Sequence, residues 1–497
     1  MLSKINKWLI QMVLLLFVLN FLYLYFTSHS KLPPLPSSPT VTNHHFNGHS
    51  NRYLKPWPIL PSYLPWSHHS PPPSRSCEAF FGNGFSNRQD LLSTSEGGWF
   101  RCYHSDTLQS SVCEGGRIRM DPGRVKMSMG GERLEDVMGR TEEEELPKFQ
   151  NGAFELDGGP RFSGSPRRLA DDDFLDRYVP RHGVATHPIR ALIESARVVG
   201  STHFHCQEWV EEPTLLVTRF EYANLFHTIT DWYSAYVSSR VTGLPSRPNV
   251  VFVDGHCTAP MEETWKALFS SLRYAKSFSG PVCFLHAIFS PLGYETALFR
   301  GLSEQINCDG ASAHDLQQNP DERRTARLSE FGELIRAAYG FPLNRHHFEK
   351  PVSGYNVLFV RREDYLAHPR HGGKVESRLS NEQEVFDSIN NWASDHVCKV
   401  NLVNGLFAHM PMKEQVQAIQ DASVIIGAHG AGLTHIVHAL PKSVVLEIIS
   451  SHYRRPHFAL IARWKGLEYH AINLHGSYAN PEIVIDKLSN IMRSLGC

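Results

Sequence analysis

The spacing of apolar positions changes character along the chain. Residues 8–26 form an uncharged apolar run, residues 29–75 are rich in Pro, Ser, His and Asn, and residues 77 to about 190 are irregular, with many Gly, Arg and Asp. From about residue 195, short apolar runs alternate with amphipathic segments. Such alternation is typical of an α/β fold, so we expect a globular α/β body behind an N-terminal extension.

The alternating part predicts strands and helices in sequence. The apolar runs that predict strands are residues 214–218, 249–254, 282–289, 355–360, 400–403, 423–426, 443–449 and 469–473. The segments that predict helices are residues 221–241, 323–339, 381–392, 412–421, 457–464 and 481–495. Strands that alternate with helices form parallel sheets covered on both faces. The two regions 195–345 and 355–475 therefore predict two Rossmann-like domains facing a cleft.

The N-terminal run predicts a membrane anchor. Its 19 uncharged residues come near the ~20 that span a bilayer, and Lys4 and Lys7 precede them, which favours a cytosolic N-terminus. A cleaved signal peptide is the alternative, but its apolar region is usually shorter, ~7–15 residues, and ends at small residues. This run ends in Tyr23, Tyr25 and Phe26. We expect a type II membrane protein with a cytosolic tail at 1–7, an anchor at 8–26 and a luminal body.

The segment after the anchor predicts a stem over residues 27–76. Its composition buries little apolar surface, so we expect an extended, poorly ordered spacer, in which Trp57 and Trp66 allow parts to dock. Nine cysteines lie beyond the anchor, at positions 77, 102, 113, 206, 257, 283, 308, 398 and 497. An oxidising lumen would keep disulfides among them, with a pairing that the spacing leaves open. No two cysteines have the Cys-x-x-Cys spacing, so we expect no zinc site.

Charge excludes one class of function. Lys and Arg number 49 and Asp and Glu number 50, so the chain offers no basic field for nucleic acid. Asp171, Asp172 and Asp173 match the Asp-x-Asp pair with which some sugar transferases bind a metal. Because Arg167 and Arg168 precede them instead of an apolar strand, a solvated acidic turn is the favoured interpretation.

The strongest chemical motif is the glycine-rich turn at residues 424–435, VIIGAHGAGLTH. An apolar strand ends at Ile426 and a helix is expected near Leu433, so the turn would expose backbone N–H groups and a helix N-terminus, which attract phosphate. The spacing matches neither the nicotinamide fingerprint nor the P-loop. A tight turn with positive φ would explain some glycines, but not the His and Thr beside them. We therefore predict a diphosphate site. Its residues are Gly427, His429, Gly430, Ala431, Gly432, Thr434 and His435.

Charged residues at two other predicted strands fit the same site. Arg361 and Arg362 directly follow the strand 355–360, and ligands of open α/β sheets bind beyond the carboxyl ends of strands. A guanidinium there can bind phosphate with two hydrogen bonds, although a surface ion pair with Glu363 or Asp364 is the alternative. Glu447 lies inside the apolar strand 443–449, where an unpaired carboxylate is costly. We expect it to meet ligand hydroxyls, with a ribose as the natural candidate, or a neighbouring arginine.

The predicted helix 221–241 carries candidate acid–base residues. At 100° per residue its apolar side chains form one stripe, and His227, Asp231, Ser234 and Ser238 fall on the opposite face. His227 and Asp231 are four residues apart and so are neighbours on the helix. Small hydroxyls beside this pair suit the wall of a cleft, where Asp231 could act as general base with His227 orienting it. A local His–Asp hydrogen bond without catalytic consequence is the alternative.

Three stretches together resemble glycosyltransferase family 61. They are EYANLFHTITDWYSAY at 221–236, NVLFVRREDYLAHPR at 356–370 and the turn at 424–435. The resemblance covers about residues 77–497, and it is strongest to the members that transfer xylose in plant N-glycan processing. It implies an inverting enzyme that moves xylose from UDP-xylose to the core β-mannose of N-glycans in β1,2 linkage. A member that transfers another sugar, such as N-acetylglucosamine, or a non-catalytic glycan-binding protein is the alternative.

The resemblance also implies a fold and roles for residues. The fold would be of the GT-B kind, with an acceptor-side Rossmann-like domain at 77–350 and a donor domain at 351–497. Arg361 and the turn would hold the diphosphate, and Glu447 would lie near the ribose. Asp231, or else His227, would deprotonate the mannose hydroxyl. The arginine and backbone dipoles would neutralise the diphosphate without a metal, and the enzyme would reside in the Golgi membrane.

Overall fold

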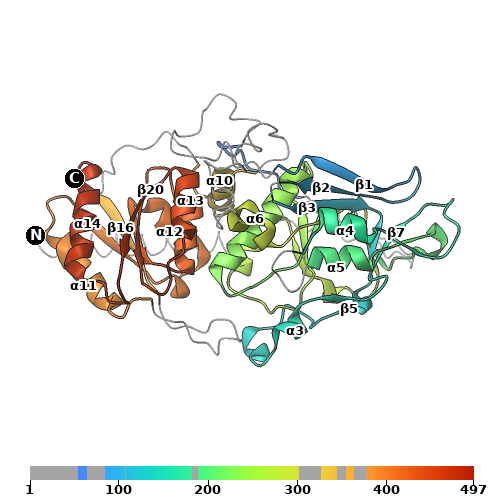
Figure 1. Ribbon diagram of the computed structural model, residues 1–497, viewed down its shortest axis with the longest axis horizontal. Coiled ribbons are helices and arrows are strands. Elements are labelled where there is room, and N and C mark those ends of the chain that lie inside the picture. The colour runs from blue at the N-terminus through green and yellow to red at the C-terminus, as the bar shows by residue number, and fades with distance from the viewer. Residues whose placement is uncertain are drawn as a thin grey trace, which may run out of the picture. The chain divides into compact units, whose positions relative to one another are not determined.

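The computed structural model describes residues 54–63, 84–106, 108–181, 188–300, 326–343, 354–362 and 378–497. All described residues belong to one compact unit, Leu54–Cys497 (Figure 1). Within these ranges no helix is both long and apolar enough to cross a membrane. The anchor predicted at 8–26 lies outside the described residues, as does most of the stem.

The C-terminal half is built on a five-stranded parallel sheet. Its order is β17-β16-β18-β19-β20, so the chain reverses direction across the sheet between β16 and β18. The strands are β16 (Tyr355–Val360), β17 (Val400–Gly405), β18 (Val424–Ala428), β19 (Val444–Ile449) and β20 (Glu468–Asn473). This is the doubly wound arrangement expected of a Rossmann-like domain, in which the point of reversal is where ligands bind.

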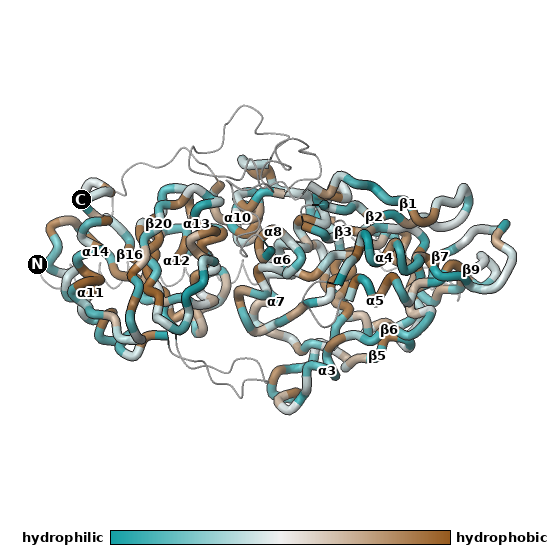
Figure 2. Tube along the Cα trace, in the orientation of Figure 1, coloured by the Kyte–Doolittle hydropathy of each residue, from teal (hydrophilic) through white to brown (hydrophobic). Residues whose placement is uncertain are grey.

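Helices cover both faces of this sheet because its strands are apolar on both faces. The helices are α11 (Glu382–Asp395), α12 (Met412–Asp421), α13 (His457–Lys465) and α14 (Pro481–Ser494). One set of alternating strand residues, including Val357 and Ile426, packs with α11 and α14. The other set, including Leu358 and Ile425, packs with α12 and α13. Figure 2 shows the apolar positions concentrated in the strands and the helix faces turned toward them.

The N-terminal half contains two larger sheets. The seven-stranded sheet has the order β1-β2-β3-β15-β11-β12-β13, and the six-stranded sheet has the order β10-β14-β4-β7-β9-β8. The strands of the first are β1 (Asn87–Ser93), β2 (Trp99–Ser105), β3 (Ser110–Gly116), β11 (Thr214–Val217), β12 (Asn249–Phe252), β13 (Leu272–Tyr274) and β15 (Ala287–Phe289). Those of the second are β4 (Ile118–Met120), β7 (Phe154–Asp157), β8 (Arg167–Arg168), β9 (Arg197–Val199), β10 (Glu208–Val210) and β14 (Val282–Phe284).

The prediction that residues 77–190 are irregular was wrong. In the seven-stranded sheet only β15, β11, β12 and β13 pair in parallel, and β3, β2 and β1 extend that sheet in antiparallel fashion. The signal was hidden because these strands are not apolar: β3 is buried along its whole length yet carries Glu114, which pairs with Arg101 and His286. Likewise, the single apolar run at 282–289 is two strands in two sheets. This half is therefore Rossmann-like only in part.

Helix α6 (Leu225–Val241) is buried on all sides rather than along one stripe. Its first residue, Leu225, lies four residues after the start of the predicted helix, because Asn224 caps the helix by accepting the N–H of Phe226 with its side chain. Its polar face does not line open space: the Ser234 hydroxyl donates to the carbonyl of Pro291, and Ser238 donates to the carbonyl of Ser234. The polar face that was predicted to form the wall of a cleft is thus buried at Ser234 and Ser238.

Helix α10 (Leu328–Ala338) connects the two halves. On one side, Glu330 accepts the hydroxyl of Tyr236 from α6 at 3.0 Å, and Phe331 packs against the same tyrosine ring. On the other side, Arg336 donates to the carbonyl of His438, near the glycine-rich turn, at 2.6 Å. Buried apolar residues of both halves form one continuous cluster around this helix. The halves therefore share a core.

Part of the predicted stem is folded against this core. The Arg240 guanidinium lies between the rings of Trp57 and Tyr63, 4.2 and 4.1 Å from their centroids. Ser62 donates through its N–H and its hydroxyl to the buried carboxylate of Glu333, at 2.8 and 2.7 Å. We call residues 54–63 the strap. The sequence analysis allowed parts of the stem to dock through Trp57, and the strap does dock, because its apolar and aromatic side chains find partners on α6 and α10.

Three disulfides join cysteines of the described residues. They are Cys102–Cys113, Cys206–Cys283 and Cys398–Cys497. Cys257 is a buried free thiol, and the cysteines at 77 and 308 lie outside the described residues. The expectation that disulfides form is confirmed, and such bonds persist in oxidising compartments.

Candidate functional site

The point of reversal in the five-stranded sheet brings two predicted motifs together. Arg361 and Arg362 follow β16, and His429 follows β18, its parallel neighbour. Because the carboxyl ends of parallel strands meet at one edge of the sheet, the arginines and the glycine-rich turn lie on the same side. The predicted placement of the two arginines and the glycine-rich turn at the carboxyl edge of this sheet is confirmed.

The three glycines of the turn are needed for close packing and not for positive φ. Gly427 and Gly432 lie against Val360 at the end of β16: a Cβ on Gly432 would meet Val360 Cγ1 at 2.8 Å. Gly430 has an extended backbone, with φ of 176°, but a Cβ there would lie 2.8 Å from Nη1 of Arg362. None of the three is in the left-handed region. The alternative of a tight turn with positive φ is therefore wrong.

Arg362, rather than Arg361, lies against the turn. The Arg361 side chain points to the first turn of α11, where it donates to Gln383 at 2.8 Å and to Glu382 at 3.4 Å. It also covers the ring of Phe386. The backbone N–H of Arg362 donates to Glu382, while its guanidinium reaches Gly430. Arg361 thus forms an ion pair with Glu382, whereas the carboxylates that the sequence suggested for it, Glu363 and Asp364, lie outside the described residues.

Glu447 is completely buried and orients His429. Its Oε1 lies 2.5 Å from Nδ1 of His429, and its Oε2 accepts the hydroxyl of Tyr469 at 2.6 Å. These partners are not the arginine that the sequence suggested. A carboxylate beside Nδ1 keeps the proton on that nitrogen, so the opposite edge of the imidazole, Nε2, is the one available to a ligand.

Thr434 and His435 point into the core and not out of the turn. The expected helix after the turn is a 3-10 helix, η10 (Ala431–His438), and both side chains are completely buried in it. Nε2 of His435 contacts Oε1 of Gln415 at 2.8 Å. Burial lowers the pKa of His435 to about 3, so the ring is neutral at physiological pH. Thr434 and His435 therefore support the turn from the core side, whereas Ala431 is half-buried at the surface of the turn.

Asp231 holds two backbone segments next to α6. Its Oδ1 accepts the N–H of Gly293 at 3.0 Å and its Oδ2 accepts the N–H of Phe220 at 3.1 Å. The side chain is almost completely buried, and this burial raises the pKa of Asp231 to about 8, against the opposing effect of the two N–H groups. Each oxygen still has a second lone pair. The carboxylate is thus a stronger base than an exposed one.

His227 pairs with a tyrosine that sequence reasoning missed. Its Nδ1 forms a short hydrogen bond with the hydroxyl of Tyr294, from the loop that follows β15. The Tyr294 ring is packed between Phe220 and Phe299, with centroids 4.3 and 3.9 Å away. His227 and Asp231 therefore do not pair with each other as predicted. His227 contacts Tyr294, and Asp231 accepts two backbone N–H groups. The position of Tyr294, after a strand that is parallel to β11, was the available signal.

Residues from the two halves meet beside the turn. The ring of Phe226, on α6, stacks on that of His457, the first residue of α13, with centroids 5.4 Å apart and planes at 4°. His429 lies 6.2 Å from His457 by ring centroids. Burial, together with the neighbouring His457, lowers the pKa of His227 to about 4. The helix with the predicted base and the turn with the predicted diphosphate site are thus neighbours.

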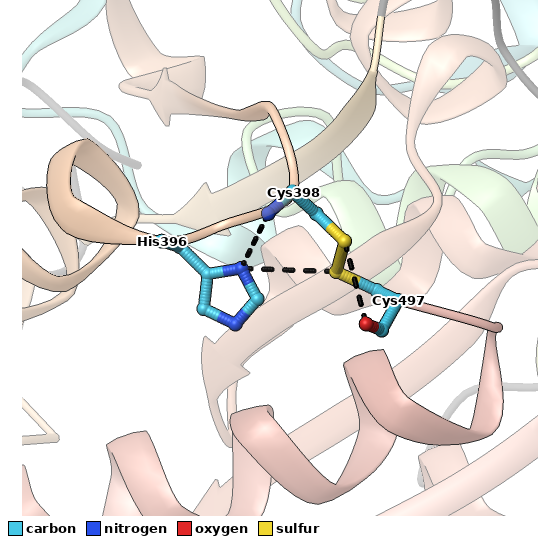
Figure 3. A group of neighbouring side chains, drawn as sticks. All are labelled: His396, Cys398 and Cys497. Carbon is cyan, nitrogen blue, oxygen red and sulfur yellow. Dashed lines mark hydrogen bonds between the residues drawn. A yellow bond between two sulfur atoms is a disulfide. The ribbon is translucent and has the colours of Figure 1, made fainter.

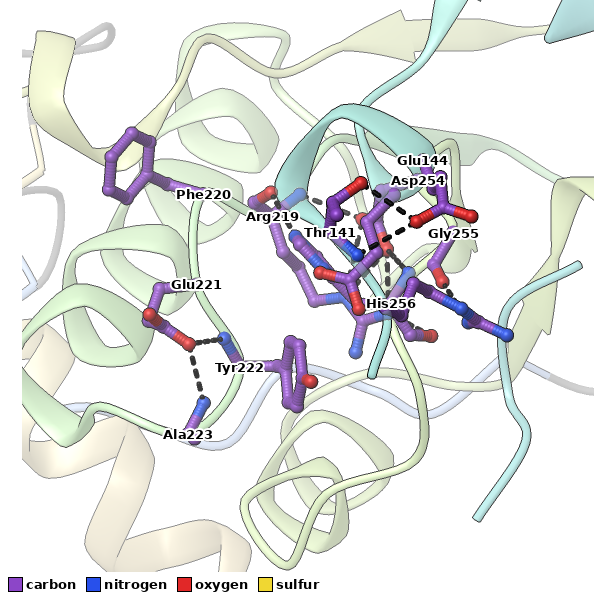
Figure 4. Close-up of polar contacts among 12 residues, drawn as sticks. Thr141, Glu144, Arg219, Phe220, Glu221, Tyr222, Ala223, Asp254, Gly255 and His256 are labelled. Atoms are coloured by element: carbon purple, nitrogen blue, oxygen red, sulfur yellow. Dashed lines mark hydrogen bonds and ion pairs between the residues drawn. The ribbon is translucent and has the colours of Figure 1, made fainter. Parts of the chain in front are cut away.

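The segment that leads into α6 is held by a buried polar network (Figure 4). Asp254 accepts the backbone N–H of Arg219 at 2.8 Å and its guanidinium at 2.7 Å, and His256 bridges Glu145 and the carbonyl of Arg219. Glu221 accepts the N–H groups of Tyr222 and Ala223. Both charges of the Arg219–Asp254 pair are satisfied inside the protein, so the network fixes this segment rigidly.

Two groups of side chains could suggest a metal, and neither fits one. Among the described residues, His396, Cys398 and Cys497 bring ligand-type atoms within 4.8 Å of one another. Both sulfurs belong to one disulfide (Figure 3), so no thiolate is available, and His396 accepts the N–H of Cys398. Asp171 caps the helix α4 (Asp172–Tyr178) by accepting the N–H of Phe174, which agrees with the solvated acidic turn.

Comparisons with known proteins identify the family of the chain. Residues 209–446 match the model of the family Glycosyltransferase 61. The chain is 59% identical to a β-1,2-xylosyltransferase of Arabidopsis thaliana over the whole of both chains. It is 64% identical to a β-1,2-xylosyltransferase of Oryza sativa subsp. japonica, over 89% of this chain and 84% of that one.

A more distant relative covers only part of the chain. It is an EGF domain-specific O-linked N-acetylglucosamine transferase of Gallus gallus, 25% identical over 53% of this chain and 45% of the relative. The similarity to the plant enzymes, by contrast, extends along the whole sequence, including the part that precedes the family match. The turn, the helix and the arginines described above thus occur in a chain that belongs to glycosyltransferase family 61.

Proposed function

We propose that this enzyme transfers xylose from UDP-xylose to the core β-mannose of N-glycans, forming a β1,2 linkage with inversion. The observation that carries the proposal is the meeting of α6, with its acid–base residues, and the glycine-rich turn at one edge of the parallel sheet, in a chain similar along its length to xylosyltransferases. An edge of this kind is where open α/β sheets bind nucleotide ligands.

The donor diphosphate would lie on the turn. Arg362 and the oriented His429 supply positive or donating groups there, and Gly430 and Gly432 let backbone approach the phosphates closely. Arg361 would contribute from the outer side, since it is already paired with Glu382. Glu447 would act by holding His429 and Tyr469 near the nucleotide. Because cationic and dipolar groups are provided by the chain, we expect transfer without a metal.

Transfer would be a single displacement. The mannose oxygen forms a bond to C1 of xylose as the bond from C1 to the diphosphate oxygen breaks, and UDP leaves with that electron pair. The mannose hydroxyl gives its proton to Asp231, whose raised pKa suits a base that works near neutral pH. His227 is the alternative base. The charge that develops on UDP would be stabilised by Arg362, His429 and backbone N–H groups.

We also propose that the enzyme is anchored in the Golgi membrane through residues 8–26, with its body in the lumen. The support is the uncharged apolar run after Lys4 and Lys7, and the three disulfides of the body, which suit an oxidising compartment. Tagging the two ends of the chain and treating sealed microsomes with protease would test this layout. A protected C-terminal tag and a cleaved N-terminal tag are expected.

The decisive assay uses a fragment that begins at residue 54 and so retains the strap. It would be incubated with a core N-glycan acceptor and a panel of UDP-sugars in the presence of chelator, and product mass would be followed. A gain of one pentose from UDP-xylose alone is expected. A gain from UDP-N-acetylglucosamine instead would support the alternative, in line with the activity named for the Gallus gallus relative. Loss of transfer on chelation would contradict metal independence.

A further inference from the structure

The first residue of α13, His457, occupies the junction between the two halves. The helix follows β19 on the donor side, and its first ring stacks face to face on Phe226 of α6. This contact fixes the plane of the imidazole. The ring is only partly buried, and among the described residues neither of its nitrogens has a hydrogen-bond partner. Because Phe226 covers one face of the His457 ring and both ring nitrogens are available, the edge of this ring can bind a ligand.

The groups around His457 are predominantly basic. His429 faces it from the turn, His227 from α6, and Arg455 from the segment before α13. Burial and the nearby His429 and Arg455 lower the pKa of His457 to about 4. The rings of His227 and His457 are therefore neutral in the empty protein and would gain protons if an anion lay between them.

Carboxylates near this cluster are already engaged. Glu447 is shared between His429 and Tyr469, and Asp231 accepts two backbone N–H groups. Glu221, at the start of the segment before α6, accepts two more. A metal does not suit the cluster either, because among the described residues these imidazoles do not form a group with ligand atoms within 4.8 Å of one another. An anion is the ligand that the charges favour.

We propose that His457 binds the diphosphate of the nucleotide-sugar donor, as a residue of the donor site beyond the glycine-rich turn. This inference rests on the proposed function for the identity of the anion. His457 would donate a hydrogen bond to a phosphate oxygen, while Phe226 holds the plane of its ring. Because Phe226 belongs to the acceptor half, the same contact would link donor binding to the position of α6.

The test compares UDP with uridine, which lacks the phosphates. His457→Ala and His457→Asn would be prepared in the fragment from residue 54, with His475→Ala, an exposed histidine, as the matched control. Dissociation constants would be measured by calorimetry for UDP and by ligand-observed NMR for uridine. Loss of one charge-assisted hydrogen bond predicts about tenfold weaker UDP binding with uridine binding unchanged. The control should bind both as the unaltered fragment does.

The outcomes separate this inference from the proposed function. Unchanged UDP binding in His457→Ala, or an equal loss for UDP and uridine, would overturn the role of His457. Thermal unfolding of each variant checks that α13 is intact, and His457→Asn, which keeps a donor, should retain part of the affinity. If substitution of His457 weakens UDP binding as expected but the unaltered fragment transfers a sugar other than xylose, the inference stands and the proposed function fails. If the unaltered fragment binds no UDP, the inference is overturned.

Discussion

The carboxylate of Asp231 is the group on which the proposed chemistry depends most. In Asp231→Asn the side chain keeps its size but no longer accepts a proton, so transfer should fall by about 10²–10⁴-fold, the usual contribution of a general base. UDP binding should change little, because the diphosphate site is on the other half. Initial rates of xylose transfer and UDP calorimetry would measure both effects.

The control for this substitution is Ser234→Ala, three residues along the same helix, whose hydroxyl donates to Pro291. Ser234→Ala removes a buried hydrogen bond but leaves the proposed base, Asp231, in place, so it should reduce stability more than activity. An Asp231→Asn enzyme that transfers xylose at the unaltered rate would remove Asp231 from the role of base and leave His227 as the candidate.

Gly432 provides a second test at the scale of single residues. A methyl group at this position would lie 2.8 Å from Val360 Cγ1, so Gly432→Ala should destabilise the protein by about 1–3 kcal/mol and weaken UDP binding. Gly476→Ala is the matched control, because a Cβ there meets nothing within 4 Å. Chemical denaturation would give both free energies of unfolding. Partial recovery in Gly432→Ala with Val360→Ala would identify the clash as the cause, and no recovery would contradict it.

At the scale of elements, the strap is part of the folded body. A fragment that begins at residue 64 lacks the ring contacts of Trp57 and the Ser62 contacts to Glu333, which would leave a buried carboxylate without these donors. We expect this fragment to unfold several degrees below the fragment that begins at residue 54. Differential scanning calorimetry would measure the difference.

Two substitutions inside the strap refine this prediction. Trp57→Ala removes the ring over Arg240 and should cost about 2 kcal/mol of unfolding free energy. Ile59→Ala, two residues away, changes a side chain that is 80% exposed and should cost less than about 0.5 kcal/mol. Equal effects of the two substitutions would show that the strap does not dock in solution.

For the whole molecule, buried histidines predict sensitivity to acid. Because burial lowers the pKa of His435 to about 3, its folded form favours the neutral ring, so this contribution to stability is complete above about pH 6.5 and is lost as the pH falls toward 3. At pH 5 the loss from His435 alone is roughly 2 kcal/mol. Urea denaturation of the unaltered fragment at pH 7.5 and pH 5 would measure it.

His435→Asn should make stability less dependent on pH between 7.5 and 5, whereas His475→Asn, on the surface, should not. A pH dependence unchanged by His435→Asn would refute the assignment. Two carboxylates act in the opposite direction at higher pH. Burial raises the pKa of Asp231 and of Glu330 to about 8, so their contribution is complete below about pH 4 and is lost as the pH rises through 8.

The sequence by itself determined the parts of this protein in which local pattern and tertiary environment agree. The doubly wound half is of this kind: its central strands β16, β18 and β19 are apolar and largely buried, and α12 and β16 have the predicted bounds. The edge at which the arginines and the glycine-rich turn lie follows from the same order of elements. The motif at 424–435 was therefore readable before its geometry was known.

Only the tertiary structure decided which side chains meet. The antiparallel strands between 87 and 157 were missed because their polar residues are satisfied by partners far away in sequence, as Glu114 is by His286. Arg361 and Arg362 are adjacent in the chain, yet packing directs one to Glu382 and the other to Gly430. His457 and Tyr294 carry no motif, and they reach the site through stacking on Phe226 and a hydrogen bond to His227. Contacts between distant segments are set by packing of the whole body, which periodicity along one segment does not encode.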